Sequence, residues 1–177
     1  MNFPEMFPFE ETVRHRLVNA RRIAIVGIGD VLSPFDRPGM TAAEEIEKLH
    51  LPGVKVFFAG TVPESITRAL RVYQPDHVIF LDAADMGAPP GCIQVIEPED
   101  TQANLVSSHV LPLPVVMEFI AVDTGSRVTL LGIQPDLTRP DRELSGPEQE
   151  LFQRNILALT GILRLACSPV SLSNRIQ

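Results

Sequence analysis

The sequence predicts an α/β fold: a three-layer sandwich in which a twisted, mostly parallel five-stranded sheet carries helices on both faces. Two observations indicate it. Short apolar runs alternate along the chain with helical segments, which is the order typical of a parallel sheet with crossover helices. These runs are largely apolar rather than strictly alternating, as expected for strands that are buried on both faces. At 177 residues, the chain has the length of one such domain.

The first part of the chain combines a helix and a strand. An amphipathic helix is expected over residues 10–20, because Val13, Leu17 and Val18 share one face at helical spacing. Residues 1–20 are therefore expected to form an N-terminal helical extension, and residues 21–170 a single α/β domain. The first strand is expected at 23–26, where an apolar run ends at a glycine-containing turn.

Helices and strands then alternate. Thr41 and Glu44 have the spacing of a capping box, which predicts a helix over residues 42–49. The apolar run at 54–58 predicts the second strand. Proline is favoured in the first turn of a helix, so Pro63 indicates a helix that continues to about residue 73.

The second half of the chain supplies three more strands. Largely apolar runs predict the third and fourth strands at 77–81 and 93–96. A helix over 115–122, ended by a glycine, leads to the fifth strand at 127–131. A closing helix is expected over 147–165, because leucines and isoleucines recur along one side of it.

Composition excludes several classes of function. The chain has 15 Lys and Arg against 22 Asp and Glu, a net charge of −7, and it lacks the clustered cations that nucleic-acid binding requires. No apolar run reaches the roughly 18–20 residues that span a bilayer, and the N-terminus does not resemble a signal peptide. We expect a cytoplasmic monomer with no nucleic-acid partner and no membrane insertion.

Acidic residues and one histidine follow the predicted strands, and function in open α/β sheets lies at the carboxyl ends of the strands. Asp30 and Asp36 follow the first strand, Asp82 the third, and His109 lies in the long loop after the fourth. Two carboxylates and an imidazole suit a borderline divalent metal ion and leave coordination positions open. Simpler explanations remain: Asp30 could bond its own turn, Asp36 and His109 could be exposed loop residues, and Asp82 could cap a loop amide.

Two other site types are disfavoured. Gly27 and Gly29 suggest a dinucleotide-binding turn, but Leu32 occupies the position of the third glycine. The second strand also ends on Ala59 and Gly60 rather than on an acidic residue for the ribose. A serine hydrolase needs a Gly-x-Ser-x-Gly turn, which the sequence lacks.

A set of segments stands in a definite order along the chain: Gly27-Ile28-Gly29-Asp30 with Asp36 and Gly39, Gly60-Thr61-Val62-Pro63-Glu64, Phe80-Leu81-Asp82-Ala83-Ala84-Asp85-Met86-Gly87, His109, and Leu131-Gly132-Ile133-Gln134-Pro135. Together they resemble segments of the hydrogenase maturation proteases over about residues 22–165. Asp-Ala-x-Asp-Met-Gly and Gly-Ile-Gln-Pro-Asp most resemble the branch acting on the formate-hydrogenlyase hydrogenase. The chain departs from the family pattern at Asp30, where Asn is usual, and at Phe35, where the first of two adjacent acids is usual.

The resemblance implies an endopeptidase that removes the C-terminal extension of a nickel-loaded [NiFe]-hydrogenase large-subunit precursor. It implies that Asp36, Asp82 and His109 bind nickel that the precursor supplies. Asp36 or Asp82 could then act as the general base of an aspartyl protease, or the metal could polarise the scissile carbonyl or a water molecule. Two other functions stay open: a non-proteolytic chaperone for the nickel-loaded precursor, and a small-molecule hydrolase on the same fold.

Overall fold

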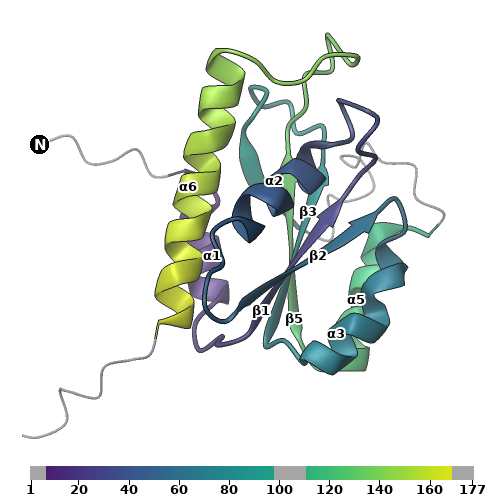
Figure 1. Cartoon of the computed structure of the whole chain (residues 1–177), viewed down its shortest axis with the longest axis vertical. Coiled ribbons are helices and arrows are strands. Elements are labelled where there is room, and N and C mark those ends of the chain that lie inside the picture. Colours follow the sequence, from purple (N-terminus) through teal and green to yellow (C-terminus); the bar gives the residue numbers. More distant parts are fainter. Residues whose placement is uncertain (1–6, 98–110, 169–177) are drawn as a thin grey trace, which may run out of the picture.

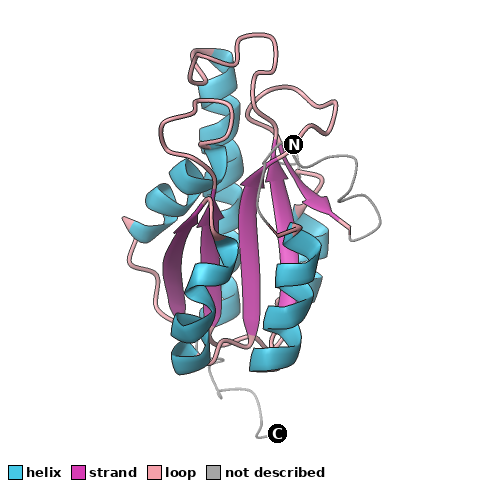
Figure 2. Ribbon diagram, turned by 90° about the vertical axis from the view of Figure 1, so that its right-hand side faces the viewer, coloured by secondary structure: helices cyan, strands magenta, loops and turns pink. Residues whose placement is uncertain are grey.

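The computed structural model of the chain describes residues 7–97 and 111–168. Five strands form one sheet in the order β2-β1-β3-β5-β4, and helices lie on both of its faces (Figures 1 and 2). The predicted α/β sandwich is therefore confirmed. Four strands are parallel and the edge strand β4 is antiparallel to β5. The strands are β1 (Ile23–Ile28), β2 (Val54–Gly60), β3 (His77–Ala83), β4 (Ile93–Ile96) and β5 (Arg127–Ile133).

The helices divide into two layers. One face of the sheet packs against α1 (Glu10–Arg16), α2 (Pro38–Glu47) and α6 (Pro147–Cys167). The other packs against the 3₁₀ helix η1 (Pro63–Ile66), α3 (Thr67–Tyr73) and α5 (Leu113–Thr124). None of the described helices is long and apolar enough to cross a membrane.

Side chains of β3 alternate between the two layers. Ile79 and Leu81 are buried with α1, α2 and α6, whereas Val78 and Phe80 are buried with α3 and α5. This is the period of two of a strand that is covered on both faces. The same alternation places Asp82, the next residue after Leu81, on the face that α3 and α5 cover.

The helix expected over residues 10–20 is shorter and lies in the core. Phe9, Val13 and Leu17 are at most 2% exposed, in one cluster with residues of α2 and α6. Val18 was expected on the same face but is 54% exposed. That prediction was wrong, because α1 ends at Arg16 and Val18 lies in the turn that follows.

The capping-box prediction for the next helix was also wrong. α2 begins at Pro38, three residues before Thr41. Proline's fixed φ suits the first helical position, so the helix begins there. Thr41 lies inside the helix, and its hydroxyl donates to the carbonyl oxygen of Arg37 at 3.4 Å.

β3 and β5 extend two residues further than the sequence predicts. Both continue past the predicted ends, to Ala83 and Ile133, and these last residues pair with each other. Asp82 is therefore a residue of the strand itself and pairs with Gly132 of β5. Strand backbone thus fixes the position of this carboxylate.

Candidate functional site

Asp36 and Asp82 lie at the same edge of the sheet. Asp36 follows β1 and stands two residues before α2, whereas Asp82 is the penultimate residue of β3. β1 and β3 are neighbours in the sheet and run parallel, so their carboxyl ends meet at one edge, where the connecting loops gather (Figure 2). Asp36 is 8% exposed and Asp82 is fully buried. The structure therefore brings both predicted carboxylates to the edge at which the sequence placed them.

The loop that carries Asp36 is folded upon itself. The backbone N–H of Asp30 donates to Oδ2 of Asp36 at 2.9 Å. Oδ1 of Asp30 accepts from the backbone N–H of Leu32 at 2.9 Å, which is the self-bonded turn expected for Asp30. The N–H groups of Asp36 and Arg37 both donate to the carbonyl oxygen of Ser33. These bonds fix the orientation of the Asp36 carboxylate before any ligand binds.

Two glycines allow the backbone segments at this edge to approach closely. Gly29 has φ of 127°, and a Cβ there would lie 1.9 Å from the carbonyl oxygen of Asp36. A Cβ on Gly39, in the first turn of α2, would lie 2.2 Å from the carbonyl oxygen of Leu81 and 2.4 Å from that of Ile28. The N-terminus of α2 therefore rests directly on the ends of β1 and β3, next to Asp82. Its partial positive charge favours carboxylates at this edge.

Small and apolar groups surround the strand partner of Asp82. Oδ1 of Asp82 accepts from the backbone N–H of Ala83 at 2.9 Å. Its partner Gly132 has no side chain, and a Cβ there would lie 2.9 Å from both Sδ of Met86 and Cβ of Ala84. Burying a carboxylate in such surroundings is unfavourable unless it is hydrogen-bonded, paired or bound to a cation. The site therefore holds a fixed, buried carboxylate at the carboxyl edge of the sheet.

The third predicted ligand, His109, lies outside the described residues. Within residues 7–97 and 111–168, no group of three or more His, Cys, Asp or Glu side chains could hold a metal ion. Asp36 and Asp82 are thus two candidate oxygen ligands, or candidate general bases. A complete metal coordination shell would need further ligands from outside the described residues.

The model of one protein family, hydrogenase maturation protease (HycI), matches residues 40–157. The chain belongs to this family. It is therefore a peptidase and a hydrolase. The matched region contains Asp82 and Gly132, and Asp36 lies just before it.

Individual relatives agree with this assignment. The chain is 32% identical over 111 residues to the hydrogenase 3 maturation protease of Escherichia coli K12, covering 62% of this chain and 70% of the relative. The crystal structure of the [NiFe] hydrogenase maturation protease HycI from Thermococcus kodakarensis is similar, with a TM-score of 0.73 and 32% identity over 86% of this chain and 99% of that one. The solution structure of the endopeptidase HycI from Escherichia coli has a TM-score of 0.66 and 27% identity, over 79% and 90%.

Gln134 also lies at the carboxyl edge of this maturation protease, and it was not among the predicted site residues. It follows β5 directly and is 4% exposed. Its side chain bonds the loop that follows β3. The available signal was a polar residue immediately after a buried strand, within Gly-Ile-Gln-Pro.

Asp136, two residues further on, forms a structural cluster. Its carboxylate accepts from the backbone N–H and hydroxyl of Thr138 and from Nε of Arg139. The hydrogen bond from Thr138, and then that from Arg139, hold the pKa of Asp136 below its ordinary value. Arg139 also pairs with Glu148 at the start of α6. These bonds anchor the β5–α6 loop, so the carboxylate of Asp136 has a structural role.

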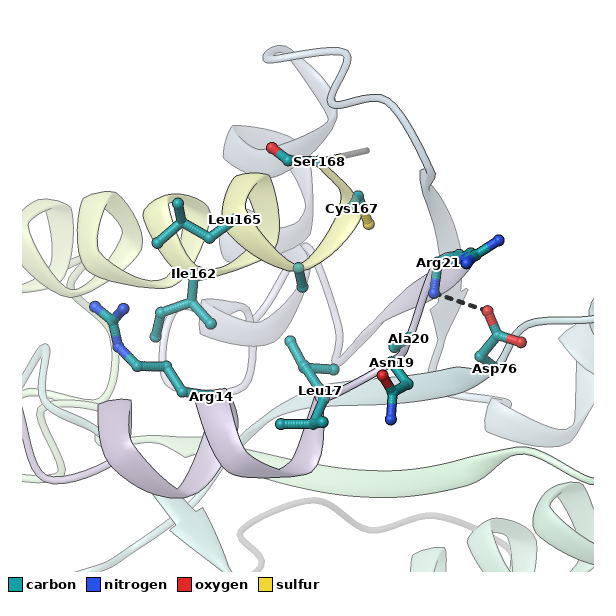
Figure 3. A pocket seen from close by; sticks show the side chains of 12 residues that line it. Arg14, Leu17, Asn19, Ala20, Arg21, Asp76, Ile162, Leu165, Cys167 and Ser168 are labelled. Atoms are coloured by element: carbon teal, nitrogen blue, oxygen red, sulfur yellow. Dashed lines mark hydrogen bonds between the residues drawn. The ribbon is translucent and has the colours of Figure 1, made fainter. Parts of the chain in front are cut away.

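A wide depression of about 1120 Å³ lies at the opposite edge of the sheet, between α1 and the end of α6 (Figure 3). Its carboxylate, Asp76, accepts from the backbone N–H groups of Arg21 and Arg22 at 2.8 and 2.7 Å. Burial raises the pKa of the Cys167 thiol there, so this sulfur is not an activated nucleophile. The depression therefore offers no catalytic group comparable to the carboxylates at the carboxyl edge.

Proposed function

We propose that this maturation protease removes a C-terminal extension from the nickel-loaded precursor of a [NiFe]-hydrogenase large subunit. The observation that carries the proposal is the placement of Asp36 and Asp82 at the carboxyl ends of two adjacent parallel strands. Membership of the family supports the proteolytic chemistry. The names of the similar proteins, a hydrogenase 3 maturation protease and a [NiFe] hydrogenase maturation protease, support the substrate class.

Nickel enters this proposal as part of the substrate. Asp36, Asp82 and His109 would meet the ion with oxygen and nitrogen ligands, which are too few for a closed structural site. The precursor can complete the shell with thiolates, which bind nickel more strongly than carboxylates do. Recognition of the ion then ensures that only a loaded precursor is cut.

The chemistry follows from the two carboxylates. A metal ion can polarise the scissile carbonyl or lower the pKa of an attacking water molecule. Asp36 or Asp82 can take the proton from that water as general base. Each carboxylate has one oxygen bonded to a backbone N–H group, which fixes the plane of the carboxylate. We further propose that the enzyme acts in the cytoplasm as a monomer.

Co-expression with a hydrogenase large subunit tests the proposed function. We expect the mass of the large subunit to fall by that of a C-terminal peptide when the protease is present, and to stay at the precursor value when it is absent. A stable complex with an uncut precursor would instead identify a chaperone. An unchanged precursor without a complex would contradict both functions and leave a small-molecule hydrolase.

A further inference from the structure

Gln134 joins the end of β5 to the loop between β3 and β4. Its Oε1 accepts from the backbone N–H of Met86 at 2.7 Å and from that of Ala88 at 3.3 Å. Its Nε2 donates to Oδ1 of Asp85 at 3.4 Å. Its own backbone N–H donates to the carbonyl oxygen of Cys92, where the loop returns to the sheet. One buried residue therefore binds both the start and the end of this loop.

The bond to Met86 determines what lies beside Asp82. A Cβ on Gly132 would stand 2.4 Å from Cδ1 of Ile96 and 2.9 Å from both Cβ of Ala84 and Sδ of Met86, so the thioether is one of three apolar groups that fill the space this glycine leaves. Gly132 pairs with Asp82 across β5 and β3, and paired residues of neighbouring strands share one face. Met86 thus forms an apolar wall on the same face as the buried carboxylate.

We propose that Gln134 is a positioning residue of the proteolytic site, a role that rests on the proposed function. It holds Met86 against Gly132, so that Asp82 meets the substrate in a preformed and water-poor surrounding. A fixed, desolvated environment strengthens the electrostatic interactions of a catalytic carboxylate, whereas water that enters weakens them. Gln134 does not itself touch the reacting atoms.

Loss of the side-chain acceptor has a specific consequence. The N–H groups of Met86 and Ala88 turn to water when no protein acceptor faces them, because an unpaired buried donor is unfavourable. The loop then detaches from β5, and Met86 leaves Gly132. Asp82 keeps its own bond from the N–H of Ala83 and can still meet the nickel of the substrate, so the effect falls on turnover rather than on affinity.

The test uses the full-length protease and nickel-loaded precursor, with kcat and KM measured separately at a temperature well below unfolding. We expect Gln134→Met, which keeps the side-chain volume but removes both polar groups, to lower kcat at least tenfold with KM within twofold. Met86→Ala should lower kcat by a similar factor while Gln134 stays in place. This second variant keeps the proposal falsifiable if Gln134→Met does not fold.

A milder variant separates positioning from a general loss of stability. Asp85→Ala removes the weak contact with Nε2 of Gln134 but leaves Oε1 to accept from the N–H groups of Met86 and Ala88, so kcat should stay within threefold of wild type. Ser126→Ala is the matched control. It removes a buried hydrogen bond, from its hydroxyl to the carbonyl oxygen of Pro75 at 2.6 Å, at the opposite edge of the sheet, and kcat should be unchanged.

Hydrogen exchange at the amides of Met86 and Ala88 gives a readout that needs no substrate. Exchange should be at least tenfold faster in Gln134→Met than in wild type, and unchanged in Ser126→Ala. Wild-type kcat in Gln134→Met or in Met86→Ala would overturn the proposal, as would an equal loss of kcat in Ser126→Ala. Failure of the wild-type enzyme to cut any precursor would instead overturn the proposed function, and the exchange result would still report on the loop.

Discussion

Asp82 is the residue on which cleavage depends most directly in the proposed mechanism. Asp82→Asn keeps the size of the side chain and an acceptor for the N–H of Ala83, so the fold should persist. Loss of the charge should lower the processing rate by about 100-fold or more, the range typical of an acid–base residue. Processing of nickel-loaded precursor and thermal unfolding measure the two effects.

The matched control for this change is Asp141→Asn, which removes an exposed carboxylate from the β5–α6 loop. This variant should process nickel-loaded precursor at the wild-type rate. Wild-type activity in Asp82→Asn would exclude Asp82 from catalysis. An unfolded Asp82→Asn protein would show that the carboxylate has a structural role.

Gly29 is predicted to be irreplaceable for a steric reason. In Gly29→Ala the new Cβ would meet the carbonyl oxygen of Asp36 at 1.9 Å, at a φ that L side chains rarely adopt. The Asp36 loop must move, and the free energy of unfolding should fall by about 1–3 kcal/mol. Denaturant unfolding and the processing assay should both show a loss.

Gly161→Ala provides the same substitution in open space within α6. Alanine favours helix over glycine, so this variant should be stabilised by about 0.5–1 kcal/mol. If the two variants were equally stable, the close contact between Gly29 and Asp36 would not be significant in solution.

At the scale of elements, α1 is predicted to be part of the folding unit. Val13→Ala removes two methyl groups from a position that is 1% exposed, and should lower the free energy of unfolding by about 2 kcal/mol. Val18→Ala changes an exposed side chain and should have an effect within about 0.5 kcal/mol. Denaturant titration of both variants checks this, and equal effects would contradict the packing of α1 against α6.

The first residue of β3, His77, is a buried histidine that is held neutral beside β5. His77 is 1% exposed, and its Nε2 lies 2.8 Å from Oγ1 of Thr129. Burial, and then the positive charges of Arg127 and Arg16, lower the pKa of His77 from 6.5 to about 4. In the unfolded chain the imidazole takes up a proton below about pH 6.5, so the unfolded state binds more protons than the native state between pH 6.5 and 4.

Stability should therefore fall as the pH decreases through this window, by up to about 3 kcal/mol for a shift of this size. This loss of stability is absent above pH 6.5, where the imidazole of His77 is neutral in both the native and the unfolded state. His77→Gln should flatten the dependence of unfolding free energy on pH between 6.5 and 4. His50→Gln, at an exposed position, should leave it unchanged, and identical slopes in all three proteins would show that His77 titrates normally.

At the scale of the whole molecule, hydrophobic pattern determined most of what could be predicted. Apolar runs such as the one that became β1 (Ile23–Ile28) are buried in the sheet, so the number of strands and the sandwich followed from sequence. Helix starts were less certain, because Pro38 and Thr41 offer competing signals. The packing of α1 against α6 could not be predicted, since it depends on contacts between segments about 140 residues apart.

The candidate site was predictable only in part. The rule that parallel strands end at one edge placed Asp36 and Asp82 together. The role of Gln134 depends on the path of the β3–β4 loop, and the close approach at Gly39 depends on the position of α2 over β1 and β3. Such contacts join distant parts of the chain and leave no periodic pattern. The position of His109 lies outside the described residues, so its role stays a prediction.

The dependence of cleavage on nickel in the substrate tests the central claim most directly. Purified large-subunit precursor would be prepared with and without nickel, incubated with the purified protease, and followed by intact-mass spectrometry. We predict loss of a C-terminal peptide from the nickel-loaded precursor and an unchanged mass for the nickel-free precursor, because in the proposed function Asp36 and Asp82 recognise the ion that the precursor brings. Efficient cleavage of the nickel-free precursor would contradict this account and favour a mechanism in which the aspartates act without the metal.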